Sequence, residues 1–232
     1  MKEIFETYVD NAFGEYKQAE FKFEQFENNY KKFFPADKDS FVLDVGIGRG
    51  EMLSCMKNWG YRNYLGVDIS PSTVSFCRSI QLNCMQINET SEWLQGYPNH
   101  FDLITLLDVL EHVNKENTIH FLRAIHSSLK STGVVIIQVP NLQAPDGQLH
   151  RYNDFTHEVG YVEHTLSQVL MCSGFTNINF YGFETLIARS YTSYKQLLLR
   201  RIYWKFIRKI REITENLNPN ILHPVMFAVA TK

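Results

Sequence analysis

Glycine occupies every second position from Gly46 to Gly50, shortly after an acid at Asp44. Glycine lets the backbone turn sharply and leaves no side chain between the main chain and a ligand. The apolar run 41–45 precedes these glycines, and Glu51 begins a stretch of helix-forming residues. This order predicts a buried strand, a bare loop and a helix whose first N–H groups face a nucleotide-type ligand.

A second apolar run, 64–68, also ends on an acid. A carboxylate at the end of the second strand can accept two hydrogen bonds from a ribose diol, and Asp68 is placed for that role. The glycines depart from the dinucleotide-binding pattern G-x-G-x-x-G because Glu51 stands at its third glycine position, so a dehydrogenase is disfavoured. An ordinary strand-to-helix turn would explain the glycines alone, but not the two acids with them.

These two runs resemble motif I and the ribose-binding acid of class I S-adenosylmethionine (SAM) dependent methyltransferases. The resemblance implies S-adenosyl-L-methionine as cofactor and S-adenosyl-L-homocysteine as product. It also implies cofactor contacts after the first four strands. Asn88 and Glu89 stand where an aspartate commonly meets the adenine, so either can serve. The implied cofactor-binding residues are Asp44, Gly46, Gly48, Arg49, Gly50, Asp68, Ile69, Asn88, Glu89 and Asp108.

The run D-V-L-E-H at 108–112 follows another apolar stretch, 103–107. Open sheets bind ligands at the carboxyl ends of their strands, so Asp108, Glu111 and His112 are expected to line the pocket. This run looks like the post-strand motif of a methyltransferase group that includes quinone-pathway and sugar enzymes. In some relatives a similar set binds a divalent metal, and these residue types could do so here. A helix-capping acid and a hydrogen-bonded histidine are the simpler expectation, so no metal site is predicted.

A polar loop at 151–166 follows the fifth predicted strand, where an acceptor would be received. Its pattern N-D-F-T-H-E-V-G-Y-x-E-H-T-L is similar to the loop of bacterial methyltransferases that act in O-antigen and capsule polysaccharide biosynthesis. The resemblance implies a sugar, a nucleotide sugar or a lipid-linked glycan as acceptor. The methyl group would go to a hydroxyl or to a phosphate of that acceptor.

A sugar hydroxyl must lose its proton as the new bond forms, and histidine is the natural base. His157 is favoured because it lies in the acceptor loop, and His112 is second. Asp108 would orient the base or bind the acceptor. A structural histidine that bonds its own loop is the alternative for His157. A phosphate acceptor would need no base.

Strands and helices alternate from residue 40, which predicts a mostly parallel α/β sheet with helices on both faces. Methyltransferases of this class have a Rossmann-like fold with seven strands, of which the last is antiparallel. Strands are predicted at 41–45, 64–68, 84–87, 103–107, 134–139, 177–181 and 225–230, and helices at 51–59, 71–80, 115–129 and 165–173. Within a single domain, 1–232, we predict an N-terminal helical cap at 1–39, a SAM-binding core at 40–183, a basic amphipathic insertion at 190–216 and the last strand at 222–232.

The composition describes a soluble globular protein, because 44% of the 232 residues are hydrophobic and the formal net charge is -2. This balance does not suggest a nucleic-acid partner. We expect no signal peptide and no membrane-spanning segment. Four cysteines without metal-ligand spacing indicate reduced thiols, so a cytoplasmic protein is expected.

The segment 195–213 is the only strongly basic stretch. The simplest expectation is a helix whose apolar face packs on the domain under a solvated basic face. Attachment to the anionic inner face of a membrane is an alternative, because a lipid-linked glycan would be found there. A contact between two copies of the chain in a homodimer is a third possibility. The apolar face holds Leu199, Ile202, Tyr203, Phe206, Ile210 and Ile213, and the basic face holds Arg201, Lys205, Arg208 and Arg211.

These observations together predict a SAM-dependent O-methyltransferase that acts on a sugar or surface glycan. The closest alternative is an O-methyltransferase of a quinone-like or small aromatic acceptor. An alternative of another class is a catalytically silent SAM-fold scaffold in polysaccharide assembly. The presence of Asp44, Gly46, Gly48 and Asp68 argues against the scaffold.

Overall fold

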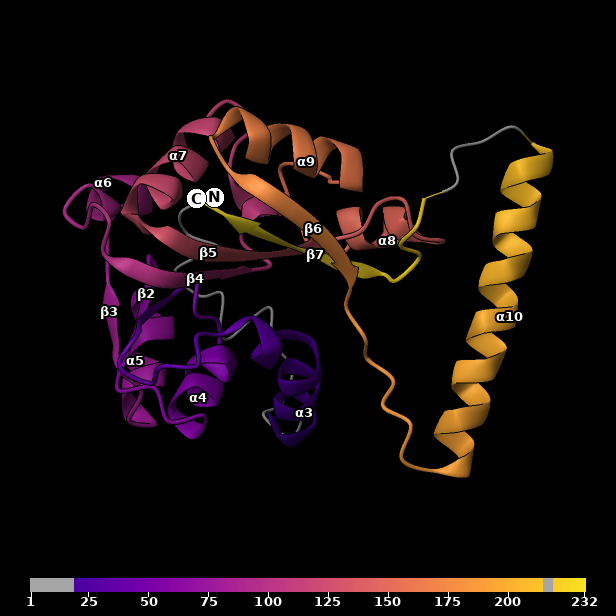
Figure 1. Ribbon diagram of the computed structural model, residues 1–232, viewed down its shortest axis with the longest axis horizontal. Helices are drawn as coiled ribbons and strands as arrows, with labels where there is room; N and C mark the ends of the chain where they lie inside the picture. The colour runs from indigo at the N-terminus through magenta and orange to yellow at the C-terminus, as the bar shows by residue number, and fades with distance from the viewer. Residues whose placement is uncertain (1–18, 215–218) are drawn as a thin grey trace.

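The computed structural model describes residues 19–214 and 219–232. Seven strands form one sheet in the order β3-β2-β1-β4-β5-β7-β6 (Figure 1). Strands β1 to β5 pair in parallel, whereas β7 is antiparallel to both β5 and β6, as predicted. The strands are β1 Phe41–Val45, β2 Asn63–Asp68, β3 Cys84–Gln86, β4 Phe101–Leu107, β5 Leu129–Pro140, β6 Thr176–Gly182 and β7 Val225–Thr231.

Helices cover both faces of the sheet (Figure 1). Side chains alternate between the faces of a strand, so Val42 packs with α3, α4 and α5 on one side while Leu43 packs with α6, α7 and α9 on the other. The helices are α3 Ala19–Tyr30, α4 Glu51–Asn58, α5 Pro71–Ser79, α6 Thr90–Leu94, α7 Thr118–Ser128, α8 Gly147–Tyr152, α9 Glu163–Cys172 and α10 Tyr191–Ile213, with single 3₁₀ turns η2 Lys31–Phe33 and η3 Leu110–His112.

The element bounds differ from the predicted ones at a few places. The helix predicted at 115–129 begins at Thr118 and ends at Ser128, because Leu129 is already paired with Phe101 in the sheet. Two short helices, α6 and α8, were not predicted. Of the predicted cap, residues 1–18 lie outside the described part of the chain, and α3 contributes to one core of the sheet through Phe26.

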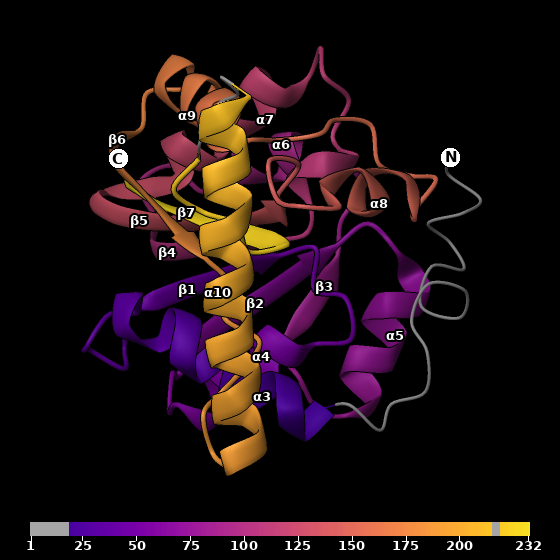
Figure 2. The same ribbon diagram turned by 90° about the vertical axis from the view of Figure 1, so that its right-hand side faces the viewer.

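The basic insertion predicted at 190–216 contains one long helix, α10, at the margin of the molecule (Figures 1 and 2), and its residues 215 and 216 lie outside the described part of the chain. The expectation that its apolar face packs on the domain is wrong, because Leu199, Ile202 and Phe206 are 64%, 56% and 61% exposed. The side turned to the domain carries arginines and Trp204 instead. Among the described residues, no helix is both long and apolar enough to span a membrane.

Candidate active site

A cavity of about 980 Å³ lies at the carboxyl ends of β1, β2 and β4, with walls from α3 and from the loop that follows α8. A volume of this size accommodates a cofactor together with an acceptor. The cavity brings together all but two of the predicted site residues, because Arg49 and Gly50 are not among those that line it. Those that do are Asp44, Gly46, Gly48, Asp68, Ile69, Asn88, Glu89, Asp108, Glu111, His112 and His157.

The glycine loop after β1 packs closely against neighbouring side chains. Gly46 has φ +75°, and a Cβ there would lie 2.4 Å from Cγ2 of Val109, so no side chain fits. Gly50 also has φ +75°, but its Cβ would meet Leu82, which packs on the far side of the loop from the cavity lining. Gly50 is therefore required for packing rather than for access of a ligand.

Asp68 ends β2 with its carboxylate at the cavity wall. One oxygen accepts a hydrogen bond from the backbone N–H of Ile47 at 3.0 Å, and the other accepts from Ser70 at 2.8 Å. Burial raises the pKa of this carboxyl group, and the backbone N–H bonds oppose that rise. Each carboxylate oxygen can accept more than one hydrogen bond, so a ribose diol can be bound at the same time.

Asp44 is 2% exposed, and its carboxylate accepts a hydrogen bond of 2.6 Å from the Thr105 hydroxyl. Burial, opposed by the Thr105 hydrogen bond and assisted by the nearby charges of Glu51 and Asp68, raises the pKa of Asp44 to about 7. Lys22 from α3 pairs with Glu51 at 2.7 Å across the same opening. A cationic group of a ligand beside Asp44 would stabilise the ionised form of this carboxyl group.

SAM binding is therefore expected to release protons near pH 6 to 7, because its ammonium group favours ionised Asp44. In the protein alone, the folded state keeps a proton that the unfolded state has lost between about pH 4 and pH 7. The contribution of Asp44 to stability thus falls as the pH rises through that window. SAM should raise the melting temperature more at about pH 8 than at about pH 6.

Calorimetric titrations in two buffers of different ionisation enthalpy measure the protons released. The Asp44→Asn variant, which has no proton to release at this position, should show a smaller number. An equal number in both proteins would mean that Asp44 does not sense the ammonium group.

Asp108 follows β4 in a left-handed conformation with φ +55°, which is uncommon for a residue other than glycine. The amide of Gln138 donates to its carboxylate at 2.8 Å, and the Tyr30 hydroxyl donates to the oxygen of the same amide. Burial raises the pKa of Asp108 to about 6. This chain of hydrogen bonds ties α3 to the sheet at the cavity and fixes the direction of Asp108.

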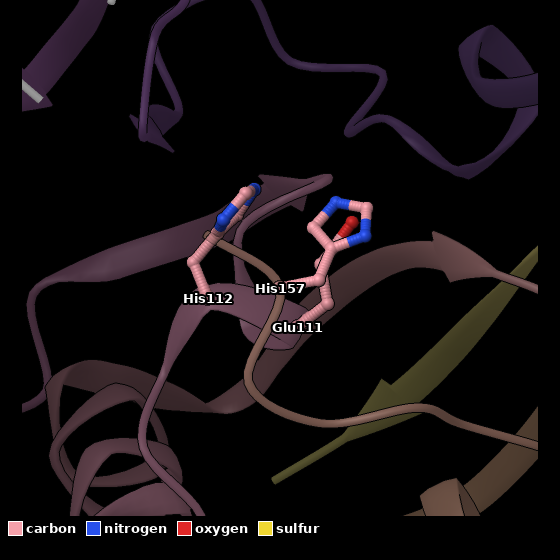
Figure 3. A group of neighbouring side chains, drawn as sticks. All are labelled: Glu111, His112 and His157. Carbon is pink, nitrogen blue, oxygen red and sulfur yellow. The ribbon is translucent and has the colours of Figure 1, made fainter. Parts of the chain in front are cut away.

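Glu111, His112 and His157 form a cluster at the cavity (Figure 3). Each offers one nitrogen or carboxylate oxygen, and these three atoms lie within 4.8 Å of one another. The two imidazole rings meet edge to face with their centroids 4.8 Å apart. The carbonyl oxygen of Glu111 accepts hydrogen bonds from Glu158 at 2.7 Å and from Val159 at 3.1 Å, which anchors the acceptor loop beside the cluster.

Hydrogen bonds determine which nitrogen of His112 carries its proton. The Thr156 hydroxyl donates its only proton to Asp154 at 2.6 Å, so it can only accept from Nδ1 of His112 at 2.8 Å. The carbonyl oxygen of Thr156, which is also an acceptor, lies 3.3 Å from the same nitrogen. Nδ1 is therefore protonated, and Nε2 carries a lone pair. Burial lowers the pKa of His112, as does the neighbouring His157.

Glu111 is 1% exposed, and neither of its carboxylate oxygens has a hydrogen-bond partner among the described residues. Burial raises its pKa well above the usual range, and the charge of Asp108 adds to this. A buried carboxyl group without partners is costly and calls for a ligand or an ion. Two imidazoles beside it make a set of donors that suits a divalent cation.

Sequence reasoning missed the supporting residues Gln138, Asp154 and Thr156. Gln138 interrupts the apolar β5 segment, and a lone polar residue in a buried strand was a usable signal. Asp154 and Thr156 belong to the loop pattern, but the pattern does not show that they face His112. That contact joins segments 44 residues apart.

The sheet order, the bare loop after β1 and the carboxylate at the end of β2 define the class of Rossmann-like, class I SAM-dependent methyltransferases. Residues 18–179 match the family model described as methyltransferase domain, and the chain belongs to this family. The bare loop, Asp68 and the buried Asp44 fit SAM, which would contribute a ribose diol and an ammonium group at these positions.

Curated relatives match about half of the chain. A ubiquinone biosynthesis O-methyltransferase of Neisseria meningitidis serogroup C is 27% identical over 118 residues, which cover 47% of each chain. The uncharacterized protein MJ0638 of Methanocaldococcus jannaschii is 33% identical over 110 residues, covering 47% of this chain and 45% of that protein. The chain thus spans about half the length of the curated relatives it matches.

Solved structures share the fold over the whole chain. A SAM-dependent methyltransferase from Archaeoglobus fulgidus superposes with a TM-score of 0.71 at 24% identity, covering 100% of this chain and 99% of that one. Phosphoethanolamine N-methyltransferase 2 of Haemonchus contortus, solved with S-adenosyl-L-methionine, gives a TM-score of 0.60 at 18% identity and covers 98% of this chain and 60% of that one. At these identities the likeness establishes the fold alone.

Proposed function

We propose that the protein transfers the methyl group of SAM to a hydroxyl oxygen. The observation that carries this proposal is the hydrogen-bonded series Asp154–Thr156–His112, whose imidazole lines the same cavity as Asp68 and the glycine loop. SAM supplies a methyl group on a positively charged sulfur. The residues of the chain bind and align the reactants, and alignment of this kind contributes about 7 to 11 kcal/mol.

His112 is the base that we propose, in place of His157. Its Nε2 lone pair is fixed by the hydrogen bonds at Nδ1, so it can take the proton of an acceptor hydroxyl as the new bond forms. His157 lies in ring contact with His112 and lines the same cavity. It is the second candidate, and both histidines can contact the acceptor.

A hydroxyl acceptor is favoured over a phosphate because of the charge of the cavity. Burial raises the pKa values of Asp44, Asp108 and Glu111, but the cavity is also lined by the carboxyl groups of Glu51, Asp68, Glu89, Glu92 and Asp154. Lys22 is the only lysine or arginine among the described lining residues, and it pairs with Glu51. A phosphate group would therefore meet mainly negative charge and too few cations to neutralise it.

Two classes of hydroxyl acceptor are supported by different observations. A sugar or surface glycan is our first candidate, because α3, α8 and the acceptor loop contribute the polar side chains of Gln25, His150 and Asn153 to the cavity lining. A quinone-like phenol is the second candidate, because relatives that match half of the chain are named ubiquinone biosynthesis O-methyltransferases.

The test is a direct comparison of acceptors with isotopically labelled SAM. Nucleotide sugars, short glycans and dihydroxybenzoates are incubated separately, and labelled products are identified by mass spectrometry. Methylated glycan supports the first candidate and methylated phenol the second. Methylation on a nitrogen, or SAM binding without transfer to any acceptor, would contradict the proposal, and the second result would favour a scaffold.

The unpartnered Glu111 carboxyl group favours a second way of activating the same hydroxyl. Glu111, His112 and His157 could hold a divalent cation, which lowers the pKa of a hydroxyl group bound to it. The cation would also neutralise a carboxyl group whose burial otherwise disfavours ionisation. In this case His112 would be a ligand through Nε2 rather than a base.

Mn²⁺ or Zn²⁺ is then expected to raise the melting temperature of chelator-treated protein at pH 8, and a chelator should remove the activity. Glu111→Gln replaces a charged ligand by a neutral isostere and should abolish the thermal shift. Glu116→Gln is the matched control, because Glu116 is exposed and lies outside the cluster. Full activity in the presence of chelator would leave His112 as a base and exclude the metal.

A further inference from the structure

Among the described elements, α10 carries the most large apolar side chains that are exposed, and they form its outer face. Figure 2 shows this helix in front of the sheet, running along one side of the molecule. Its outward side chains are exposed over the full length of the helix. They include Tyr191, Tyr194, Leu198, Leu199, Ile202, Phe206, Ile210 and Ile213, which are 40% to 74% exposed.

Polar contacts fix which face of α10 is turned outward. Arg200 donates two hydrogen bonds to Glu184, one of them at 2.9 Å, and Arg211 donates to the carbonyl oxygen of Gln143 at 2.8 Å. The ring centroids of Trp204 and His223 are 4.5 Å apart. These contacts lie on one side of the helix, so rotation that would bury the apolar face requires breaking an ion pair and several hydrogen bonds.

The charge of α10 is opposite to that of the remaining chain. The helix carries seven basic residues and one acidic residue, whereas the rest of the chain has 16 basic and 24 acidic residues. Lys195, Lys205 and Lys209 are exposed on the outward side, near the apolar residues. An exposed apolar stripe flanked by lysines is the pattern of a helix that lies in the headgroup region of an anionic bilayer.

We infer that α10 docks the protein on an anionic lipid surface, with the helix axis in the plane of the membrane. Leu198, Ile202 and Phe206 form the central part of the outer face and would enter the acyl boundary. Lys195 and Lys209, one near each end, would extend their ammonium groups to lipid phosphates.

A second copy of the chain is a poorer occupant of the same face. An antiparallel pair of α10 helices centred on Ile202 would place Lys195 of one copy opposite Lys209 of the other. A parallel pair would place each lysine near its own counterpart. Lys209 pairs with Glu212 at 3.1 Å, but the helix has no acid near Lys195. Either arrangement therefore leaves a lysine without a neutralising partner in an apolar contact, whereas lipid phosphates neutralise it.

Docking through α10 would bring the cavity close to the membrane. Phe183 and Thr185 line the cavity, and the chain that continues from them reaches the start of α10 at Tyr191. Gln25 of α3 also lines the cavity and donates to the carbonyl oxygen of Thr185 at 3.1 Å, so the start of this connection is held at the wall. The inference holds for either acceptor class, because it rests only on α10.

Cosedimentation with vesicles tests the inference on the full chain. We expect binding to vesicles of phosphatidylcholine and phosphatidylglycerol in equal parts, weaker binding at high salt, and none to phosphatidylcholine alone. The double variant Lys195→Glu/Lys209→Glu should bind at least about 25-fold more weakly, at about fivefold for each lysine removed. Ile202→Ser/Phe206→Ser should also lose binding.

Matched controls separate the local surface from overall charge and from folding. Lys57→Glu/Lys115→Glu changes the net charge by the same amount at exposed lysines outside α10, and Met171→Ser removes an exposed apolar side chain of α9. Both should bind vesicles like the wild type, and all variants should still bind SAM. Equal binding to neutral vesicles, equal losses in the controls, or a dimer in solution that the α10 variants dissociate would overturn the inference.

Discussion

Replacing His112 by alanine is expected to lower the rate of methyl transfer about 10²- to 10⁴-fold, which is the usual contribution of a placed general base. The affinity for SAM should stay nearly unchanged, because the predicted cofactor contacts at Asp44 and Asp68 do not involve this ring. Single-turnover measurements with labelled SAM give the rate, and calorimetry gives the affinity.

His164→Ala is the matched control, because His164 is exposed on α9 and does not line the cavity. Thr156→Val removes the hydroxyl that accepts from Nδ1 of His112, so it should lower the rate less than loss of the ring and change the pH profile. His157→Ala tests the second candidate. Wild-type rates in the His112 variant, with a large loss in the His157 variant, would reverse the two roles.

Replacing Asp68 by alanine is expected to weaken SAM binding by about 10²-fold or more. Two hydrogen bonds from a ribose diol to a carboxylate contribute roughly 1.5 to 3 kcal/mol each, and both are lost. The N–H groups of Ile47 and Ser70 also lose their acceptor, so the glycine loop and the start of α5 should become less rigid. Titration calorimetry measures the affinity, and thermal unfolding measures the stability of the protein alone.

Asp39→Ala is the control for loss of a carboxylate, because Asp39 pairs with Arg62 at the amino ends of β1 and β2, away from the cavity. Asp68→Asn keeps one acceptor oxygen and should give an intermediate affinity. Unchanged SAM affinity in the alanine variant, with the protein still folded, would show that the ribose is not bound at β2.

The sheet could be predicted because short apolar runs alternate with helical segments, and parallel strands buried on both faces produce such runs. All seven strands were expected, and six lie within two residues of the predicted bounds, whereas β5 begins at Leu129, five residues before the predicted start. The helices α6 and α8 have only five and six residues, too few for a periodic pattern. The Glu89 side chain, which caps α6, stands where an adenine contact was sought.

The lining of the cavity was predictable where an acid lies at or just after the end of a strand, as at Asp44, Asp68 and Asp108. It was not predictable where segments far apart in the chain meet, as in the contact of Thr156 with His112. For α10 the helical periodicity of the sequence identified the apolar and the basic face, but the prediction that the apolar face packs on the domain was wrong. The face that α10 turns to the domain depends on hydrogen-bond acceptors elsewhere in the chain, such as Glu184 and the carbonyl of Gln143. The periodicity of the helix contains no information about these acceptors.

The place of β7 between β5 and β6 has a consequence for how the chain folds during synthesis. Among the described strands, β6 pairs with β7 alone, so β6 cannot join the sheet until residues 225–231 have left the ribosome. Until then the edge of β5 is open and the apolar side chains of α10 are already made. We expect a nascent chain halted near residue 220 to bind chaperones and resist protease poorly. A chain extended by an added linker that brings residues 225–231 out of the ribosome should be protected.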